Sequence, residues 1–338
     1  MDINEAKSKL DHVISISRVE MYKPIQVAEV LARARTSKGF DLAEVETYRV
    51  KSRQWRDDAT LELFNKKSTS SARFQDDLWN DSAVPPDAMS ALGMANSRSM
   101  IVEAYIYHFV AEKNRDLAGA RETLSKLEKS EELEEVLEAF SSSDLTSSAD
   151  RLFEILATAV FKSELSQSGY TVQVDRTSRS YQTKSVDSLV DLVSGGPIPL
   201  QVGRLGHTNA ADGGLDIWTN FGVAVSVKRR TLTTSLLEQI LQDTTIGALH
   251  IVCLDVEPQV SSMLKKLKSK GRGISLTSLD LLLESVKTLL ASPTTRRILV
   301  SDLLDSFDKE FPMAQTLPQF LNSRGYPEIE LSGIWRIK

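Results

Sequence analysis

Hydrophobic periodicity divides the chain into a helical first part and a second part in which helices and strands alternate. Apolar positions at helical spacing predict helices over residues 3–20, 24–35 and 101–114. After a polar, low-complexity segment at 141–148, residues 150–168 carry apolar side chains around most of the helix circumference, which predicts a buried helix. The pattern therefore predicts a mainly helical region over 1–145 and a second domain over 146–338.

The second domain contains the elements of a mixed sheet. Strands are predicted over residues 170–175, 198–202, 215–218, 222–230, 248–255 and 274–277, and helices over 233–242, 258–270, 279–291 and 295–307. The continuous apolar strand 248–255, flanked by helices, is typical of a sheet covered on both faces. We therefore predict an α/β (α+β) fold with a mixed central sheet flanked by helices and a helical N-terminal region.

Two of these strands, 215–218 and 222–230, are joined by a turn-like segment and predict a hairpin. In the second of them, small or polar residues alternate with valines, so Ser226 and Lys228 share a face. A three-residue loop over 219–221 would place Asp216 opposite Ala224 and on that same face. The hairpin thus predicts a carboxylate close to a lysine.

This arrangement is the pattern of the PD-(D/E)xK nucleases, with Asp216 as the first acid and Lys228 as the lysine. Mg²⁺ takes oxygen ligands, and a lysine beside it can position a water and offset charge on a phosphate under attack. Two positions depart from the pattern, because Leu215 replaces the usual proline and Ser226 replaces the second acid. The alternative is an ordinary edge hairpin that ends in solvated cations.

A further acid, Glu154, lies inside the apolar helix 150–168. A buried carboxylate is costly unless it is paired or bound to a metal ion. Glu154 is therefore a candidate functional residue, and the alternative is a salt bridge to a neighbouring arginine or a partly exposed position.

Composition and charge limit the class of protein. The chain has 338 residues, 41% hydrophobic and 26% charged, which is the profile of a globular protein. It has one cysteine, Cys253, which excludes a disulfide framework or a cysteine-rich zinc site, and it has neither a signal-peptide pattern nor an apolar run long enough to span a membrane. These features predict a cytoplasmic protein that has no membrane partner.

The formal net charge of −5 argues mildly against a nucleic-acid partner, but the charge is unevenly distributed. Residues 49–73 include seven basic and three acidic residues, a local charge of +4. Cations and hydroxyls bind phosphates and read base edges, so this segment offers candidate DNA contacts. They are Lys51, Arg53, Arg56, Ser70, Ser71 and Arg73. The alternative is a charged surface helix followed by a polar loop.

Several long blocks, in order along nearly the whole chain, resemble the HaeII family of Type II restriction endonucleases. They are YKPIQVAE (22–29), YRVKSRQWRD (48–57), STSSARFQD (68–76), VEAYIY (102–107) and TNAADGGLDIWTNFG (208–222). The resemblance implies a Mg²⁺-dependent bacterial endonuclease with a restriction-endonuclease-like PD-(D/E)xK core. It also implies cleavage of double-stranded DNA at a short palindromic, G/C-rich site, beside a cognate DNA methyltransferase.

The resemblance also bears on the site residues. Relatives carry glutamine at the position of Ser226, so the missing acid is a shared departure, and the second metal ligand must come from elsewhere. Glu154, which we prefer, and Glu238 on the helix after the hairpin are the two candidates. Arg229 and Arg230 differ from the relatives.

A palindromic site implies a homodimer. Base readout is expected from residues 49–73 and around His207 and Asn209, and Arg229 and Arg230 are further candidate DNA contacts. Two other functions stay open: a structure-specific DNA repair nuclease, and a non-cleaving, sequence-specific DNA-binding protein with a degenerate nuclease site.

Overall fold

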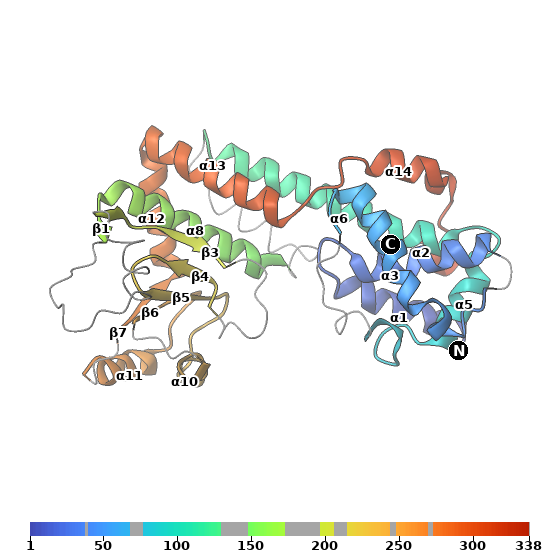
Figure 1. The fold of residues 1–338 in the computed structure, drawn as a ribbon, viewed down its shortest axis with the longest axis horizontal. Helices are drawn as coiled ribbons and strands as arrows, with labels where there is room; N and C mark the ends of the chain where they lie inside the picture. The colour runs from blue at the N-terminus through green and yellow to red at the C-terminus, as the bar shows by residue number, and fades with distance from the viewer. Residues whose placement is uncertain are drawn as a thin grey trace, which may run out of the picture. The chain divides into compact units, whose positions relative to one another are not determined.

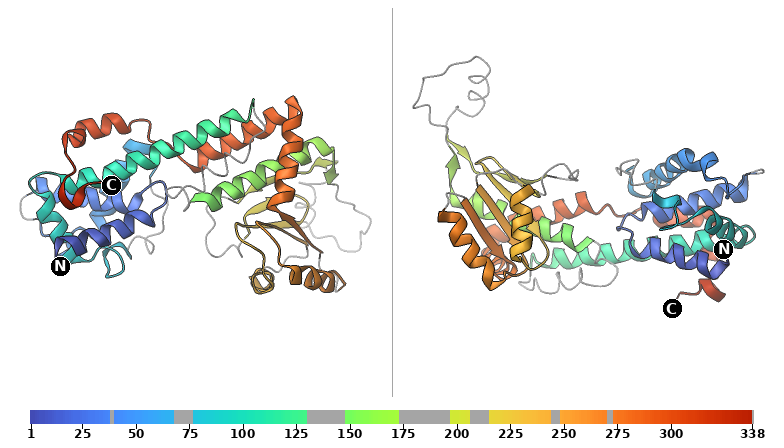
Figure 2. Two further views of the ribbon diagram at one scale, coloured as in Figure 1. Left: turned by 180° about the vertical axis from the view of Figure 1, so that it is seen from behind. Right: turned by 90° about the horizontal axis from the view of Figure 1, so that it is seen from below.

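The computed structural model describes residues 1–37, 40–67, 77–129, 148–172, 197–205, 215–243, 248–269 and 273–337. The chain forms two compact units, coloured in sequence order in Figures 1 and 2. The first unit contains Met1–Glu122 and Asp308–Lys338, and the second contains Ala149–Phe307. The sequence-based division assigned everything after residue 145 to one domain, whereas here the C-terminal segment from Asp308 belongs with the helical unit. No helix in the described ranges is long and apolar enough to cross a membrane.

The first unit is helical, as predicted. Its elements are α1 (Ile3–Ser15), α2 (Tyr22–Thr36), α3 (Val45–Phe64), η1 (Asp77–Trp79), α5 (Pro86–Asn96), α6 (Ile101–Lys126), α14 (Leu317–Arg324), η3 (Tyr326–Glu328) and η4 (Gly333–Trp335). Pro86 is the first residue of α5, a position that suits proline because the first helical N–H needs no partner within the helix.

A buried carboxylate, Glu103 on α6, joins four parts of the helical unit. It accepts hydrogen bonds from the Arg35 guanidinium (3.1 and 3.3 Å), the Asn96 amide (2.6 Å) and the Tyr326 hydroxyl (2.8 Å). Its side chain is fully buried, so these donors replace the water that the charge loses on folding.

A second buried carboxylate, Glu29 on α2, has a similar role. Tyr107 donates to it from α6 (2.8 Å) and Arg324 donates from α14 (3.3 Å). Burial raises the pKa of Glu29, while Arg324 and Tyr107 act against that shift. Because Arg324 and Tyr326 both come from the C-terminal segment, the two carboxylates hold that segment against the helical core.

The second unit is built on a five-stranded mixed sheet, which confirms the predicted fold class (Figure 1). Its strands, in spatial order, are β3 (Val202–Arg204), β4 (Ile217–Thr219), β5 (Val223–Lys228), β6 (Ala248–Cys253) and β7 (Gly273–Ser278). β4 pairs antiparallel with β3 and with β5, and β6 pairs parallel with β5 and with β7. The strand predicted over 198–202 is divided: β2 (Ile198–Pro199) pairs with β1 (Thr171–Val172) in a separate small sheet.

Helices cover both faces of the sheet (Figures 1 and 2). On one face, α8 (Ala149–Ser168) packs against β3 and β5, and α12 (Leu279–Ala291) packs beside α8. On the other, α10 (Thr234–Asp243) and α11 (Pro258–Ser269) enclose an apolar cluster with β5, β6 and β7. The last helix of the unit, α13 (Pro293–Glu310), continues into the C-terminal segment. Both faces of the sheet are therefore shielded from water, as we predicted from the continuous apolar strand 248–255.

Substitution of Glu103 tests the buried carboxylate. Glu103→Ala should lower the free energy of unfolding by about 3–5 kcal/mol, since it leaves Arg35, Asn96 and Tyr326 without their common acceptor. Glu46→Ala is the matched control, because Glu46 is largely exposed in its pair with Arg49 and should change stability by less than about 0.5 kcal/mol. Urea denaturation monitored by circular dichroism compares the two, and equal effects would contradict this account.

Candidate active site

The β4–β5 hairpin sets which side chains meet. Ile217 pairs with Val225, so the connecting loop covers residues 220–222, and Gly222 adopts the positive φ of 80° that the turn requires. The predicted three-residue loop over 219–221 is therefore displaced by one residue, and the predicted pairing of Asp216 with Ala224 is wrong by two residues along β5. A shift of two preserves the face of every side chain, so Asp216 still lies on the side of Ser226 and Lys228.

Asp216 and Lys228 form a close ion pair in this hairpin. One carboxylate oxygen of Asp216, Oδ2, accepts a hydrogen bond from the Lys228 ammonium at 3.0 Å and from the Val227 backbone N–H at 2.6 Å. The side chains of Asp216 and Lys228 are 13% and 23% exposed, so the pair is shielded yet open to solvent on one side. In the described part of the chain, the hydrogen bonds of the carboxylate all fall on Oδ2. The other oxygen, Oδ1, can therefore serve as a ligand.

Ser226 lies between Asp216 and Lys228 in the sequence motif, and it is fully buried. Its hydroxyl lies 3.5 Å from Oδ2 of Asp216, at the limit of a hydrogen bond. A neutral hydroxyl contributes no negative charge, so Ser226 cannot replace the second carboxylate of the nuclease pattern. It can only support the orientation of Asp216.

The two other predicted acids have different surroundings. Glu154 on α8 forms an ion pair with Arg204 of β3 at 3.0 Å, which was the alternative proposed for it from sequence. Glu238 is exposed on α10, between the buried Leu237 and Ile240. Within the described ranges, no group of three or more His, Cys, Asp or Glu side chains could hold a metal ion.

The donor chemistry at Asp216 nevertheless fits Mg²⁺. This ion keeps several waters and is usually held by one or two carboxylates together with phosphate oxygens of the substrate. Asp216 supplies one such carboxylate beside a cation that can contact a phosphate. The site is thus suited to an ion that arrives with a phosphate ligand, rather than to a cage made only of protein side chains.

The cations that follow Lys228 lie at the surface. The guanidinium of Arg229 pairs with Asp150, in the first turn of α8, at 2.8 Å, and Arg230 is exposed. Because Asp150 is 73% exposed, this pair is solvated and can exchange its partner for a phosphate at little cost. Both arginines are therefore accessible in the second unit.

The candidate DNA contacts of the helical unit differ in burial. Lys51 is exposed and Arg53 is half-buried on α3. Arg56 is almost fully buried, and its guanidinium binds the Gln26 amide oxygen (3.1 Å) and the Asp57 carboxylate (2.6 Å). In this conformation Arg56 serves the packing of the helical unit, unlike the exposed Lys51. The remaining candidates, Ser70, Ser71, Arg73, His207 and Asn209, lie outside the described residues.

Sequence reasoning missed two features of these sites. Arg204 was not noticed, although a cation in a short strand beside an acid-bearing helix is a signal for a paired carboxylate. Arg33 and Phe40 were also missed, because only the packing of α2 on α3 brings them next to Lys51 and Trp55.

The sequence is similar to known proteins along most of its length. The family model described as HaeII restriction endonuclease matches residues 6–326. The Type II restriction enzyme HaeII of Haemophilus aegyptius is 35% identical over 295 residues, covering 83% of this chain and 84% of that enzyme. The Type II restriction enzyme NgoBI of Neisseria gonorrhoeae is 32% identical over 341 residues, covering 96% and 97%. With the hairpin site on a mixed sheet and these matches along nearly its whole length, the chain belongs to the HaeII restriction endonuclease family.

Proposed function

We propose that the protein is a Mg²⁺-dependent endonuclease that hydrolyses phosphodiester bonds in double-stranded DNA at a short palindromic, G/C-rich site. The observation that carries the proposal is the contact of Asp216 with Lys228 across the hairpin, in a chain of this family. The names of both relatives, Type II restriction enzymes, support the same reaction. The G/C-rich palindrome rests only on the sequence resemblance.

In this proposal each residue of the hairpin has a distinct task. Asp216 would hold Mg²⁺ through Oδ1, while the Val227 N–H keeps the carboxylate in place through Oδ2. When bound, Mg²⁺ would supply positive charge beside the scissile phosphate and the attacking water. Lys228 would donate hydrogen bonds that orient the attacking water and the phosphate.

Glu154 is the better of the two candidates for a second carboxylate. It lies on α8, which packs against β3 and β5, whereas Glu238 faces solvent from α10. To serve as a ligand, Glu154 must exchange its bond with Arg204 for one with the ion. Arg204 would then be released at the edge of the sheet where a phosphate could pair with it.

The partners follow from the symmetry of the substrate. A palindrome presents the same phosphodiester on each strand, so two copies of the chain related by a two-fold axis would cut both strands. We therefore propose a homodimer bound to duplex DNA in the bacterial cytoplasm. A methyltransferase that modifies the same site would protect the host DNA.

Digestion of a long, sequenced, unmethylated DNA by the purified protein tests the proposed function. Discrete fragments that require Mg²⁺, and that are absent with EDTA and with Asp216→Ala, are expected, and sequencing of the fragment ends gives the site. A smear that depends on both would indicate a structure-specific or non-specific nuclease. Binding without cleavage under every condition would contradict the proposal in favour of a non-cleaving DNA-binding protein.

Lys228→Ala separates catalysis from binding. The substitution should slow cleavage by at least about 100-fold, because it removes a cation placed to stabilise charge on the phosphate. Affinity for duplex DNA containing the mapped site should stay within a few-fold of the wild-type value in gel-shift titrations. Lys266→Ala, an exposed lysine on α11, is the control and should leave both properties unchanged. Full cutting by Lys228→Ala would remove this lysine from the mechanism.

Arg56 and Lys51 are close in sequence but should respond oppositely to substitution. Arg56→Ala should lower the free energy of unfolding by about 2–3 kcal/mol, because buried, charge-assisted hydrogen bonds to Gln26 and Asp57 are lost. Lys51→Ala should leave stability within about 0.5 kcal/mol but weaken DNA binding. Urea denaturation and gel-shift titration of both variants are the measurements. An unchanged stability for Arg56→Ala would contradict its structural assignment.

A further inference from the structure

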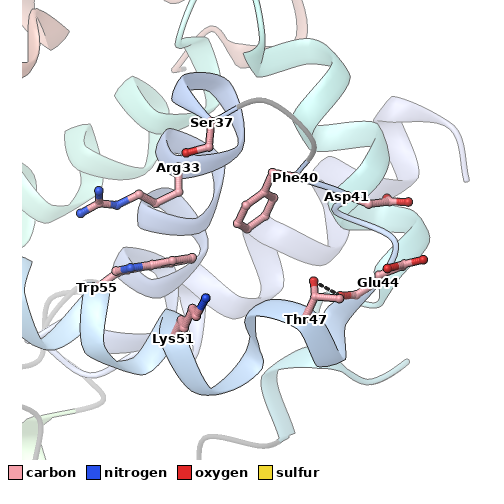
Figure 3. Close-up of a pocket in the computed structure, with 8 residues that line it drawn as sticks. All are labelled: Arg33, Ser37, Phe40, Asp41, Glu44, Thr47, Lys51 and Trp55. Atoms are coloured by element: carbon pink, nitrogen blue, oxygen red, sulfur yellow. Dashed lines mark hydrogen bonds between the residues drawn. The ribbon is translucent and has the colours of Figure 1, made fainter.

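The helical unit contains a pocket between the C-terminal end of α2 and the first turns of α3 (Figure 3). Its volume is about 370 Å³, within the range of about 300–1,000 Å³ usual for small-molecule sites. The residues that matter for its chemistry are two aromatic side chains, two cations and two carboxylates. Nothing in the hairpin site requires this pocket, so its lining calls for a separate explanation.

The aromatic side chains form a fixed wall. The rings of Phe40 and Trp55 lie 5.9 Å apart, and both pack against the apolar core on their inner side. Tyr48 stacks on Phe40 at 5.3 Å and donates its hydroxyl proton to the Leu42 carbonyl, so the support of the wall is itself anchored. A rigid aromatic surface that is only partly buried is a platform for stacking a planar ligand.

Of the two cations, Arg33 lies against this wall and Lys51 lies beside it. The guanidinium of Arg33 lies over the Trp55 ring at 5.6 Å, and Lys51 extends from the next turn of α3 (Figure 3). Neighbouring arginines are committed to carboxylates, as Arg35 is to Glu103. Among the described residues, Arg33 and Lys51 have no such ion pair. They are therefore available to an anion.

The carboxylates lie at the other end of the pocket. Figure 3 shows Asp41 and Glu44 on the side of Phe40 away from Arg33 and Trp55. An anion is repelled from that end, while groups that carry amino hydrogens are attracted to it. The pocket is thus polarised, with an anion-binding end, an aromatic wall and a hydrogen-bond-accepting end.

A nucleotide carries matching groups in the same order: a phosphate, a planar base and amino hydrogens on the edge of that base. We propose that the pocket binds one nucleotide of the DNA substrate, with its base turned out of the helix against Phe40 and Trp55. Its phosphate contacts Arg33 and Lys51, and an amino-bearing base edge faces Asp41 and Glu44. The base must leave the helix, because both faces of a paired base are covered by its neighbours in the stack. This inference rests on the proposed function, since it takes duplex DNA as the substrate.

Binding to altered duplexes tests the inference. Full-length Lys228→Ala protein in Mg²⁺ is titrated with fluorescein-labelled duplexes of the mapped site, each with an abasic residue opposite one base. The protein need not break a pair at that position, so one of these duplexes should bind at least about 10-fold more tightly than the intact site. Adding Trp55→Ala should weaken that complex by about 5- to 150-fold and abolish the preference.

Two variants serve as controls. Trp55→Phe retains an aromatic ring and should keep most of the preference, and Arg98→Ala removes an exposed cation outside the pocket and should not change it. Circular dichroism melts identify any variant that fails to fold. If Trp55→Ala does not fold, the abasic-duplex preferences of Trp55→Phe and Lys51→Ala are compared instead. Lys51→Ala should reduce the preference by removing the phosphate contact.

The outcomes separate this inference from the proposed function. If no abasic duplex binds more tightly, or if the preference survives Trp55→Ala, the pocket does not bind a base from the DNA. Titration of dGMP and dCMP forms a second arm, and saturable binding that leaves the affinity for DNA unchanged would make the pocket a mononucleotide site and overturn the inference. Wild-type cleavage is measured in parallel, and its absence would contradict the proposed function itself.

Discussion

The candidate active site depends on how the backbone and side chain of Asp216 are held between three strands. Its N–H donates to the Val225 carbonyl at 3.0 Å, and its own carbonyl accepts from the Leu205 N–H at 3.1 Å. The ladder between β4 and β5 stops there, and the Asp216 carboxylate, not a backbone carbonyl, accepts the Val227 N–H at 2.6 Å. The carboxylate thus satisfies a backbone N–H of β5 that has no partner on β4, and this hydrogen bond fixes its orientation before any ligand arrives. Such fixed orientation is the requirement for a preorganised site.

The charges around this edge are balanced in pairs. Asp216 is matched by Lys228, and Glu154 by Arg204, so in the described structure each acid near the hairpin has a cation partner. In the proposed mechanism, Asp216 and Glu154 would hold the divalent ion, and Lys228 and Arg204 would contact phosphate oxygens. Since Ser226 adds no charge, the protein holds less negative charge here than the usual nuclease pattern. The proposed ion would therefore depend more on the DNA phosphate for its ligands.

Periodicity was enough to predict the sheet and the shared face of Ser226 and Lys228, because alternation along a strand fixes the side chain's direction. Placing Asp216 on that face also required a loop with an odd number of residues, as the loop 220–222 has. Periodicity could not fix the register, since a shift of two residues leaves the alternation unchanged and only the observed Ile217–Val225 pairing decides it. Nor could it assign the C-terminal segment, whose attachment depends on Arg324 and Tyr326 finding Glu29 and Glu103, partners more than 200 residues away in the chain. Contacts that span such distances leave no local pattern.

The cations of α3 show the same limit at the scale of one helix. Positions 48, 52 and 56 repeat every four residues and face the core, so Arg56 is buried with Tyr48 and Ser52. Positions 51 and 55 form an adjacent stripe that faces the pocket, so Lys51 and Trp55 meet there. The amino-acid composition does not distinguish these basic residues, whereas the rotation of the helix buries Arg56 in the core and leaves Lys51 exposed at the pocket. A basic segment therefore becomes a binding surface only on the stripe that its own packing leaves exposed.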